Sequence, residues 1–318
     1  MKKTVLVIAL AFGVSSAFAQ DLTSKKGEPI LPEAEDWAIS FNADPIFEFV
    51  GNAFSGNVGK NTAPQVGFVN NNYTIIGKKF IDDKNAYRAL VRLGFTNTTL
   101  KNMVNDDANV AVITFPTVAP KVEDKFSTKN TNIGIGVGKE MRRGKTRLQG
   151  FYGADAMLWI SMSGTKYKYG NTMSPTTAAG TTTTPTTTDF NTPLPTGGYA
   201  SAASGSRTTQ TKSGMTFGIG VRGFIGAEYF IFPKIAVGAE YGWGIGYEMK
   251  GKGKTSTETT GGAPVSVAVQ ETEISGSSKF GFDTDINQGN MFGLTSKGSN
   301  PGVASFPGTA SLKVTFHF

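Results

Sequence analysis

The chain has 318 residues, a formal net charge of +7, no Cys and a single His. The composition therefore excludes disulfides and thiolate metal ligands, and it leaves little scope for imidazole catalysis or a His-rich metal site. Charged residues make up 17% of the chain, below the roughly 25% of ordinary soluble domains, whereas an aromatic content of 11% is too high for a disordered protein.

The first residues have the layout of a secretory signal peptide. Two lysines precede an apolar run over residues 4–14, and small residues stand at Ala17 and Ala19, before an expected cut after Ala19. An N-terminal strand of a cytosolic protein is the alternative that this layout disfavours. The sequence thus predicts three segments: a signal peptide at 1–19, a flexible polar lead-in at 20–36 and one folded domain over 37–318.

From Trp37 onward, apolar and polar residues alternate with a period of two, which is the pattern of β-strands with two different faces. Eight segments follow it, the second less cleanly than the others: Trp37–Asp44 (continuing across Pro45 to Phe49), Asn72–Ile81, Tyr87–Phe95, Ile133–Val137, Leu148–Ile160, Phe217–Tyr229, Ile235–Tyr247 and Leu312–Phe318.

Short and long connections alternate between these segments. Three are tight and carry residues suited to hairpins: Asp82–Asn85, Arg142–Lys145 and Phe232–Lys234. The others are long, at roughly residues 51–71, 98–130, 163–213 and 251–307. This rhythm is typical of outer-membrane barrels, in which short turns face the periplasm and long loops face outward.

Two segments of the long connections need separate comment. The Thr-rich stretch 175–188 has too little apolar surface to pack, so we expect it to be mobile. Ser277–Asp285 and a neighbouring segment would raise the strand count to ten if they entered the barrel. We expect them instead as a hairpin extension of the last outer loop.

The two faces of the predicted strands favour a membrane-spanning barrel over a soluble sandwich. Aromatic residues stand near strand ends on the apolar face, as interfacial girdles require: Trp37, Phe49, Tyr87, Phe95, Tyr229 and Tyr247. The opposite face carries charges of both signs beside glycines: Asp44, Glu48, Glu140, Asp155, Glu228, Glu240, Glu248, Lys78, Arg88, Arg92, Arg147, Arg222 and Lys313. A solvated charged face is the alternative interpretation.

Inside a narrow barrel, charges of both signs would pair and fill the lumen, because eight strands leave room for side chains and not for an aqueous pore. A sheet in lipid must also close, so that no strand edge is left unpaired. The predicted fold class is therefore all-β: a membrane-spanning, antiparallel, up-and-down β-barrel of eight strands, with ten left open.

No motif supports catalysis, a cofactor or a metal. Gly218–Gly223 fits G-x-G-x-x-G, but a strand follows where dinucleotide binding needs a helix. Asp283–Gly289 is similar to the start of a calcium loop, yet Gln288 and Leu294 replace its required Gly and Glu, which leaves only a weak site open. His317 would lie inward, away from approaching substrates. We predict no enzyme, and no catalytic, cofactor-binding or metal-binding residues.

Two stretches resemble a known type of protein. Gly218–Gly244 resembles the central hairpin of small outer-membrane β-barrel proteins of the Bacteroidetes type, and the ending Val314–Phe318 resembles the terminal aromatic signal that the barrel-assembly machinery reads. The general type is similar to OmpA and OmpX barrels, without the C-terminal peptidoglycan-binding domain of OmpA. This resemblance implies the cell outer membrane as location, and it implies little about activity.

The functional prediction is an integral outer-membrane β-barrel protein with a structural or surface-binding role carried by its extracellular loops. A small porin-like channel is the alternative, disfavoured by a charge-filled lumen, and a membrane-embedded barrel enzyme is a weaker one. Expected partners are outer-membrane lipid and lipopolysaccharide, the export and barrel-assembly machinery, and proteins that meet the outer loops, but not nucleic acid. Charge attraction would bring Lys250–Lys254 into contact with lipopolysaccharide phosphates, but solvated loop lysines are the favoured interpretation of this segment.

Overall fold

The computed structural model describes residues 23–24, 26–43, 54, 75–109, 120–173, 184–195, 197–261, 266–284 and 311–318. The predicted signal peptide (1–19) lies outside these residues, as do Phe49 and the second half of the predicted calcium-like loop. The described ranges contain 14 strands and a 3-10 turn, η2, at Asp107–Asn109. Within them, no helix is long and apolar enough to cross a membrane.

Eight strands pair antiparallel in a closed ring, called the strand ring below, and neighbours along the chain lie side by side in it. They are β1 (Trp37–Asn42), β2 (Ile75–Phe80), β3 (Asn85–Asn105), β4 (Lys121–Arg143), β5 (Leu148–Lys168), β9 (Thr216–Phe232), β10 (Ile235–Lys250) and β14 (Ser311–His317). The last strand closes the ring, because β14 pairs with β10 on one side and with β1 on the other.

The ring strands coincide with the eight segments that alternate in the sequence, so the all-β, antiparallel, eight-stranded part of the predicted fold class is confirmed. β13 (Ser277–Thr284) stays outside the ring: it pairs with β10 over residues 243–250, beyond the part of β10 that pairs with β14. The segment thus lies outside the ring, as predicted. It does not form the predicted hairpin with its neighbour, because residues 266–274 pair with residues 253–261 instead.

Three short connections join ring strands at one end of the sheet, over residues 81–84, 144–147 and 233–234. In the first, the Asp82 carboxylate accepts hydrogen bonds of 2.7 Å from the backbone N–H groups of Lys84 and Asn85. These bonds, that of Lys84 foremost, lower the pKa of Asp82 below its ordinary value. The tight turns are confirmed, with corrections at their ends: Arg142 and Arg143 belong to β4, Asn85 to β3 and Phe232 to β9.

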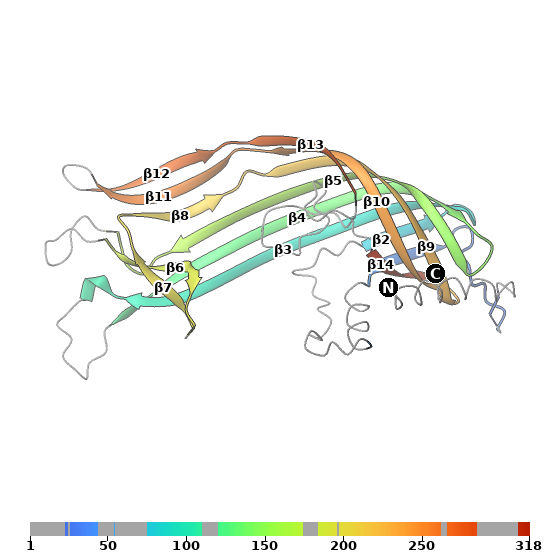
Figure 1. Ribbon diagram of the computed structural model, residues 1–318, viewed down its shortest axis with the longest axis horizontal. Coiled ribbons are helices and arrows are strands. Elements are labelled where there is room, and N and C mark those ends of the chain that lie inside the picture. The colour runs from blue at the N-terminus through green and yellow to red at the C-terminus, as the bar shows by residue number, and fades with distance from the viewer. Residues whose placement is uncertain are drawn as a thin grey trace, which may run out of the picture.

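β3, β4 and β5 continue past the ring into a second, open stretch of sheet, called the extension. It consists of residues 97–105, 121–130 and 163–168 of those strands, with β8 (Ser206–Lys212), β11 (Gly253–Gly261) and β12 (Ser266–Ile274). Figure 1 shows it as a curved layer that runs leftward from the ring. The long connections were predicted as loops, but their described parts are mostly strand. Thr and Ser on both faces remove the alternation there, while Thr keeps its β-propensity.

A two-stranded hairpin lies against the far end of the extension. It consists of β6 (Thr186–Pro193) and β7 (Tyr199–Ala203), seen at the left of Figure 1. The fully buried carboxylate of Asp124 in β4 accepts hydrogen bonds from the backbone N–H groups of Gly170 (2.7 Å) and Thr188 (2.8 Å). The prediction that residues 175–188 do not pack is therefore wrong for Thr187 and Thr188, which are buried.

The lead-in is packed where it is described. Ile30 is fully buried against Phe230 and Ala236, at the end of the ring that carries the short turns. Its carbonyl accepts a 3.3 Å hydrogen bond from the backbone N–H of Lys234, whose ammonium group pairs with Asp36. The polar composition predicts a flexible segment here, whereas one apolar side chain anchors it to the ring.

We expect Asp124→Ala to release the β6–β7 hairpin without unfolding the ring. The change leaves two backbone donors without a partner, and each such loss costs about 1–3 kcal/mol. Limited proteolysis and amide hydrogen exchange should show faster cleavage and exchange at residues 186–203. Lys139→Ala, an exposed change on the same strand but at its other end, is the matched control. Equal protection in both variants would contradict this role of Asp124.

Candidate functional site

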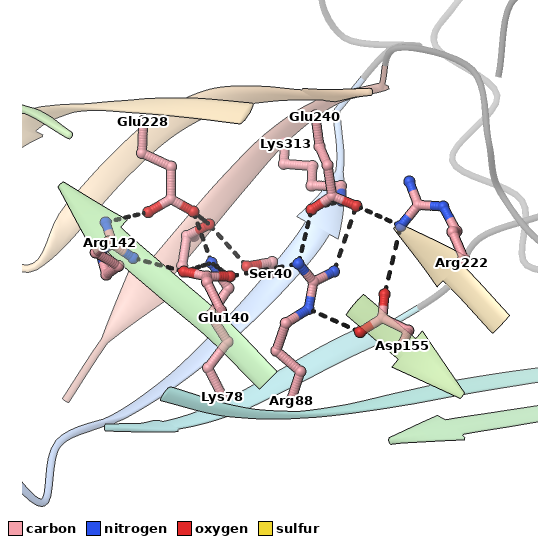
Figure 2. Close-up of polar contacts among 11 residues, drawn as sticks. Ser40, Lys78, Arg88, Glu140, Arg142, Asp155, Arg222, Glu228, Glu240 and Lys313 are labelled. Carbon is pink, nitrogen blue, oxygen red and sulfur yellow. Dashed lines mark hydrogen bonds and ion pairs between the residues drawn. The ribbon is translucent and has the colours of Figure 1, made fainter. Parts of the chain in front are cut away.

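The interior of the strand ring holds a cluster of buried charged and hydroxyl side chains, shown in Figure 2. The period of two explains it, because alternate residues of each strand point inward. All eight ring strands contribute at least one member: Ser40, Lys78, Arg88, Glu140, Arg142, Asp155, Arg222, Glu228, Glu240, Lys313 and Thr315. Each is at most 9% exposed.

Four of these residues close one square of ion pairs. The Lys78 ammonium lies 3.0 Å from Glu140 and 2.8 Å from Glu228. Arg142 joins the same two carboxylates, at 3.0 Å to Glu140 and 2.8 Å to Glu228. Within this square, each acid therefore contacts two cations and each cation contacts two acids. The four groups come from three strands, β2, β4 and β9.

A second square lies beside the first. Glu240 contacts Arg88 at 3.0 Å and Arg222 at 2.9 Å, while Asp155 contacts the same two guanidinium groups at 3.5 and 3.4 Å. Lys313 adds a third cation to Glu240 at 2.8 Å. Arg88 also lies 3.4 Å from Glu140, so it links the two squares into one network, as the dashed lines of Figure 2 show.

The network contains four carboxylates and five cationic groups. Burying an isolated charge costs several kcal/mol, and only close partners and hydrogen bonds compensate that cost. Two hydroxyls complete the site: Ser40 and Thr315 lie 2.7 Å apart, and Thr315 donates to Glu228 over 3.3 Å. Each of the four carboxylates thus lies within 3.5 Å of at least two cationic groups, although Asp155 Oδ1 makes no hydrogen bond within the described part of the chain.

Aromatic rings and glycines fill and shape the space around the charges. The Arg88 guanidinium lies 3.8 Å from the ring centroid of Phe224, and Lys78 lies 5.0 Å from that of Phe151, both within the range of cation–π attraction. A Cβ at Gly242 would lie 2.5 Å from Arg222 Nε. Glycine is needed at position 242 because the inward side chain of Arg222 occupies the space that a Cβ would fill.

The opposite, outer face of the ring is apolar and exposed. Its residues alternate with the buried charges along the same strands, and many are about half exposed or more: Tyr87, Leu93, Val137, Ile219, Val221, Ile225, Trp243 and Ile245 among them. Val137, for example, is 66% exposed. The ring is thus charged inside and apolar outside, which inverts the usual arrangement of a water-soluble domain.

Most of the predicted inward charges lie where the alternation put them. Lys78, Arg88, Arg92, Glu140, Asp155, Arg222, Glu228, Glu240 and Lys313 are buried. Glu248 also lies on the inward face, partly buried, where it accepts a 2.9 Å hydrogen bond from the indole N–H of the buried Trp159. Arg147 instead donates to backbone carbonyls near the short turns. Asp44 and Glu48 lie outside the described residues.

Sequence reasoning missed Arg142, which it assigned to a turn. The signal was present, because Arg142 stands two residues after Glu140 and so shares its face. It is 1% exposed and bridges both acids of the first square. The composition of the Arg142–Lys145 segment is typical of a turn, so the sequence did not indicate that Arg142 continues the strand and shares the inward face of Glu140.

The remaining sequence motifs do not form a second site. His317 lies between Phe80 and Phe230, with ring centroids at 5.4 and 5.1 Å, and neither of its nitrogens has a hydrogen-bond partner in the described part of the chain. Gly218–Gly223 lies within β9. Among the described residues, no group of three His, Asp or Glu is placed to hold a metal ion.

An open cleft of about 520 Å³ lies at the seam between β3 and the β6–β7 hairpin, at the far end of the extension. Lys101, Asn105, Lys121, Leu194 and Tyr199 are among the residues that line it. Its lining combines polar, cationic and aromatic side chains.

Comparisons with models of protein families, with curated protein sequences and with solved structures gave no match.

We expect Glu240→Gln to destabilise the fold strongly. The change leaves the cations of Arg88, Arg222 and Lys313 without their shared acid, and breaking a buried pair in this way costs about 3–5 kcal/mol. Glu273→Gln is the matched control, because that carboxylate is exposed and its loss costs at most about 1 kcal/mol. Urea unfolding followed by tryptophan fluorescence measures both variants. Equal midpoints would mean that the interior network contributes little.

Proposed function

We propose that this protein is an integral outer-membrane β-barrel protein with a structural or surface-binding role. The observation that carries the proposal is the inverted polarity of the strand ring, which buries charged side chains and exposes apolar ones. Apolar side chains in contact with lipid are favourable, whereas a soluble protein rarely exposes an apolar patch larger than a few hundred Å². Closure of the ring fits the same setting, because lipid cannot satisfy an open strand edge.

The filled interior supports a structural or binding role rather than transport. The ion-pair squares, Trp159 and the phenylalanines occupy the space that a channel would need for water. Binding then falls to the parts outside the ring, and the extension with its hairpin and cleft is the described candidate. In this proposal, the extension faces the cell exterior and the short turns face the periplasm, after export by a cleaved signal peptide.

The proposed partners follow from this location. They are outer-membrane lipid and lipopolysaccharide around the apolar face, the export and barrel-assembly machinery during biogenesis, and proteins that reach the extension. The ending Leu312–Phe318 alternates outward apolar residues with Lys313, Thr315 and His317, and in this proposal it acts as the assembly signal.

A charge on the apolar face tests the membrane setting directly. Val221 in β9 is 52% exposed on the ring, and Met103 in β3 is 50% exposed on the extension. In water both would tolerate arginine equally. In a bilayer, Val221→Arg costs about 2–4 kcal/mol near the midplane, whereas Met103→Arg lies outside the lipid. We expect folded protein in the outer-membrane fraction, scored by heat-modifiable migration, to fall sharply for Val221→Arg only.

Equal yields of the two variants would overturn the membrane assignment.

A small channel is the competing function, and planar-bilayer recording separates it from the proposal. We expect no single-channel steps from the wild-type protein at neutral pH, because the interior charges pair with one another and not with water. Regular conductance steps from inserted, folded protein would favour the channel.

A further inference from the structure

The outer face of the sheet changes from apolar to basic where the ring passes into the extension. β3, β4 and β5 pair without a break in register, so residues directly opposite one another share a face. The last apolar row on the outer face contains Phe95 and Met162, both exposed. The next row on that face, two residues further along each strand, contains Lys129, Lys212 and Lys254.

Further lysines follow on the same face. Lys166 stands in the next row, opposite Ser127, and the row after that places Lys101, Lys125 and Lys168 directly opposite one another on three strands. Seven lysines therefore form one band across five strands, called the lysine band: Lys101, Lys125, Lys129, Lys166, Lys168, Lys212 and Lys254.

The acids near the lysine band compensate only part of its charge. Glu123 pairs with Lys101 at 3.3 Å and with Lys125 at 2.7 Å, and Glu271 pairs with Lys254. Across the described ranges, no carboxylate lies within ion-pair distance of the other four: Lys129, Lys166, Lys168 and Lys212. Like charges directly opposite on neighbouring strands destabilise a sheet. An anion between the rows would remove that repulsion.

We propose that the lysine band binds the phosphate groups of the phosphorylated glycolipid in the outer leaflet of the membrane that the ring spans. This inference rests on the proposed function. Successive rows on one face lie about 7 Å apart along a strand. Lys129, Lys212 and Lys254 therefore lie one row beyond the last apolar row, which contains Phe95 and Met162. Phosphate head groups occupy that level next to the acyl chains. A soluble anion would be attracted by the same charge but would not require the band to border the apolar face.

The chemistry of lysine suits this boundary. The aliphatic stem of each side chain can lie over apolar surface while the ammonium group reaches the head groups. Opposite residues on neighbouring strands have Cβ atoms about 5 Å apart, so two or three ammonium groups can meet one phosphate. The row of Lys101, Lys125 and Lys168 offers this arrangement, with Glu123 screening one side of it.

The test compares lipid retention by folded protein in detergent, measured by native mass spectrometry. The probes are bisphosphorylated lipid A and the same lipid without its phosphates, each at low ionic strength. The variant is Lys129→Gln, Lys168→Gln and Lys212→Gln together. The matched control is Lys84→Gln, Lys139→Gln and Lys145→Gln, three exposed lysines near the short-turn end of the ring. Heat-modifiable migration confirms that all three proteins are folded.

We expect the wild type and the control to retain the phosphorylated lipid in preference to the dephosphorylated one. Loss of three lysines should weaken that retention on the order of 100-fold. Equal retention by all three proteins would overturn the proposal, and so would displacement of the lipid by millimolar inorganic phosphate, which would identify a site for soluble anions. Failure of the proposed function is seen separately, in equal membrane yields of Val221→Arg and Met103→Arg.

Discussion

The fold depends on balancing buried charge inside a closed ring. Glu240 on β10 is held by Arg88 from β3, Arg222 from β9 and Lys313 from β14, so its partners come from distant parts of the chain. A carboxylate taken out of water is stable only with such partners. Removal or misplacement of any one of these strands would leave a buried charge uncompensated. The network thus favours one arrangement of strands over many that would satisfy the backbone equally well.

The same charges also define the register. Side chains alternate with a period of two, so a shift of one residue would bring the charges to the outer face and the apolar residues to the interior. In water such a shift would give the ordinary arrangement, with charges outside and apolar residues inside. In the bilayer of the proposed function it would place the charges in lipid, at a high cost in free energy. β3, β4 and β5 keep uninterrupted pairing over their whole length, which carries the register of the network unchanged into the extension.

Alternation along single strands made much of this predictable. The eight ring strands and most inward charges follow from local sequence alone, because the pattern is local. The ion pairs between strands are not local. Arg88 and Glu240 are 152 residues apart, and the sequence of neither strand indicates which residue of the other it will contact. Arg142 shared the parity of Glu140, but its neighbours had the composition of a turn.

The extension was harder to foresee because its strands carry Thr and Ser on both faces, so they resemble loops. The buried part of the Thr-rich stretch shows why composition misleads there. Thr188 contributes its backbone N–H to Asp124, and that contact depends on a carboxylate 64 residues away. Low apolar content correctly indicates that a segment forms no core of its own. It does not indicate whether a neighbouring strand offers hydrogen-bond partners.

The continuity of β3, β4 and β5 links the interior to the surface. The strands that hold Arg88, Glu140 and Asp155 in the network also carry five of the seven lysines of the lysine band, and β3 and β4 line the cleft further along. A binding surface on regular strands is held more precisely than one on loops, so less ordering entropy is lost when a partner binds. In the proposed function, the rigid, filled ring therefore holds the extension parts of β3, β4 and β5 in a fixed shape for binding.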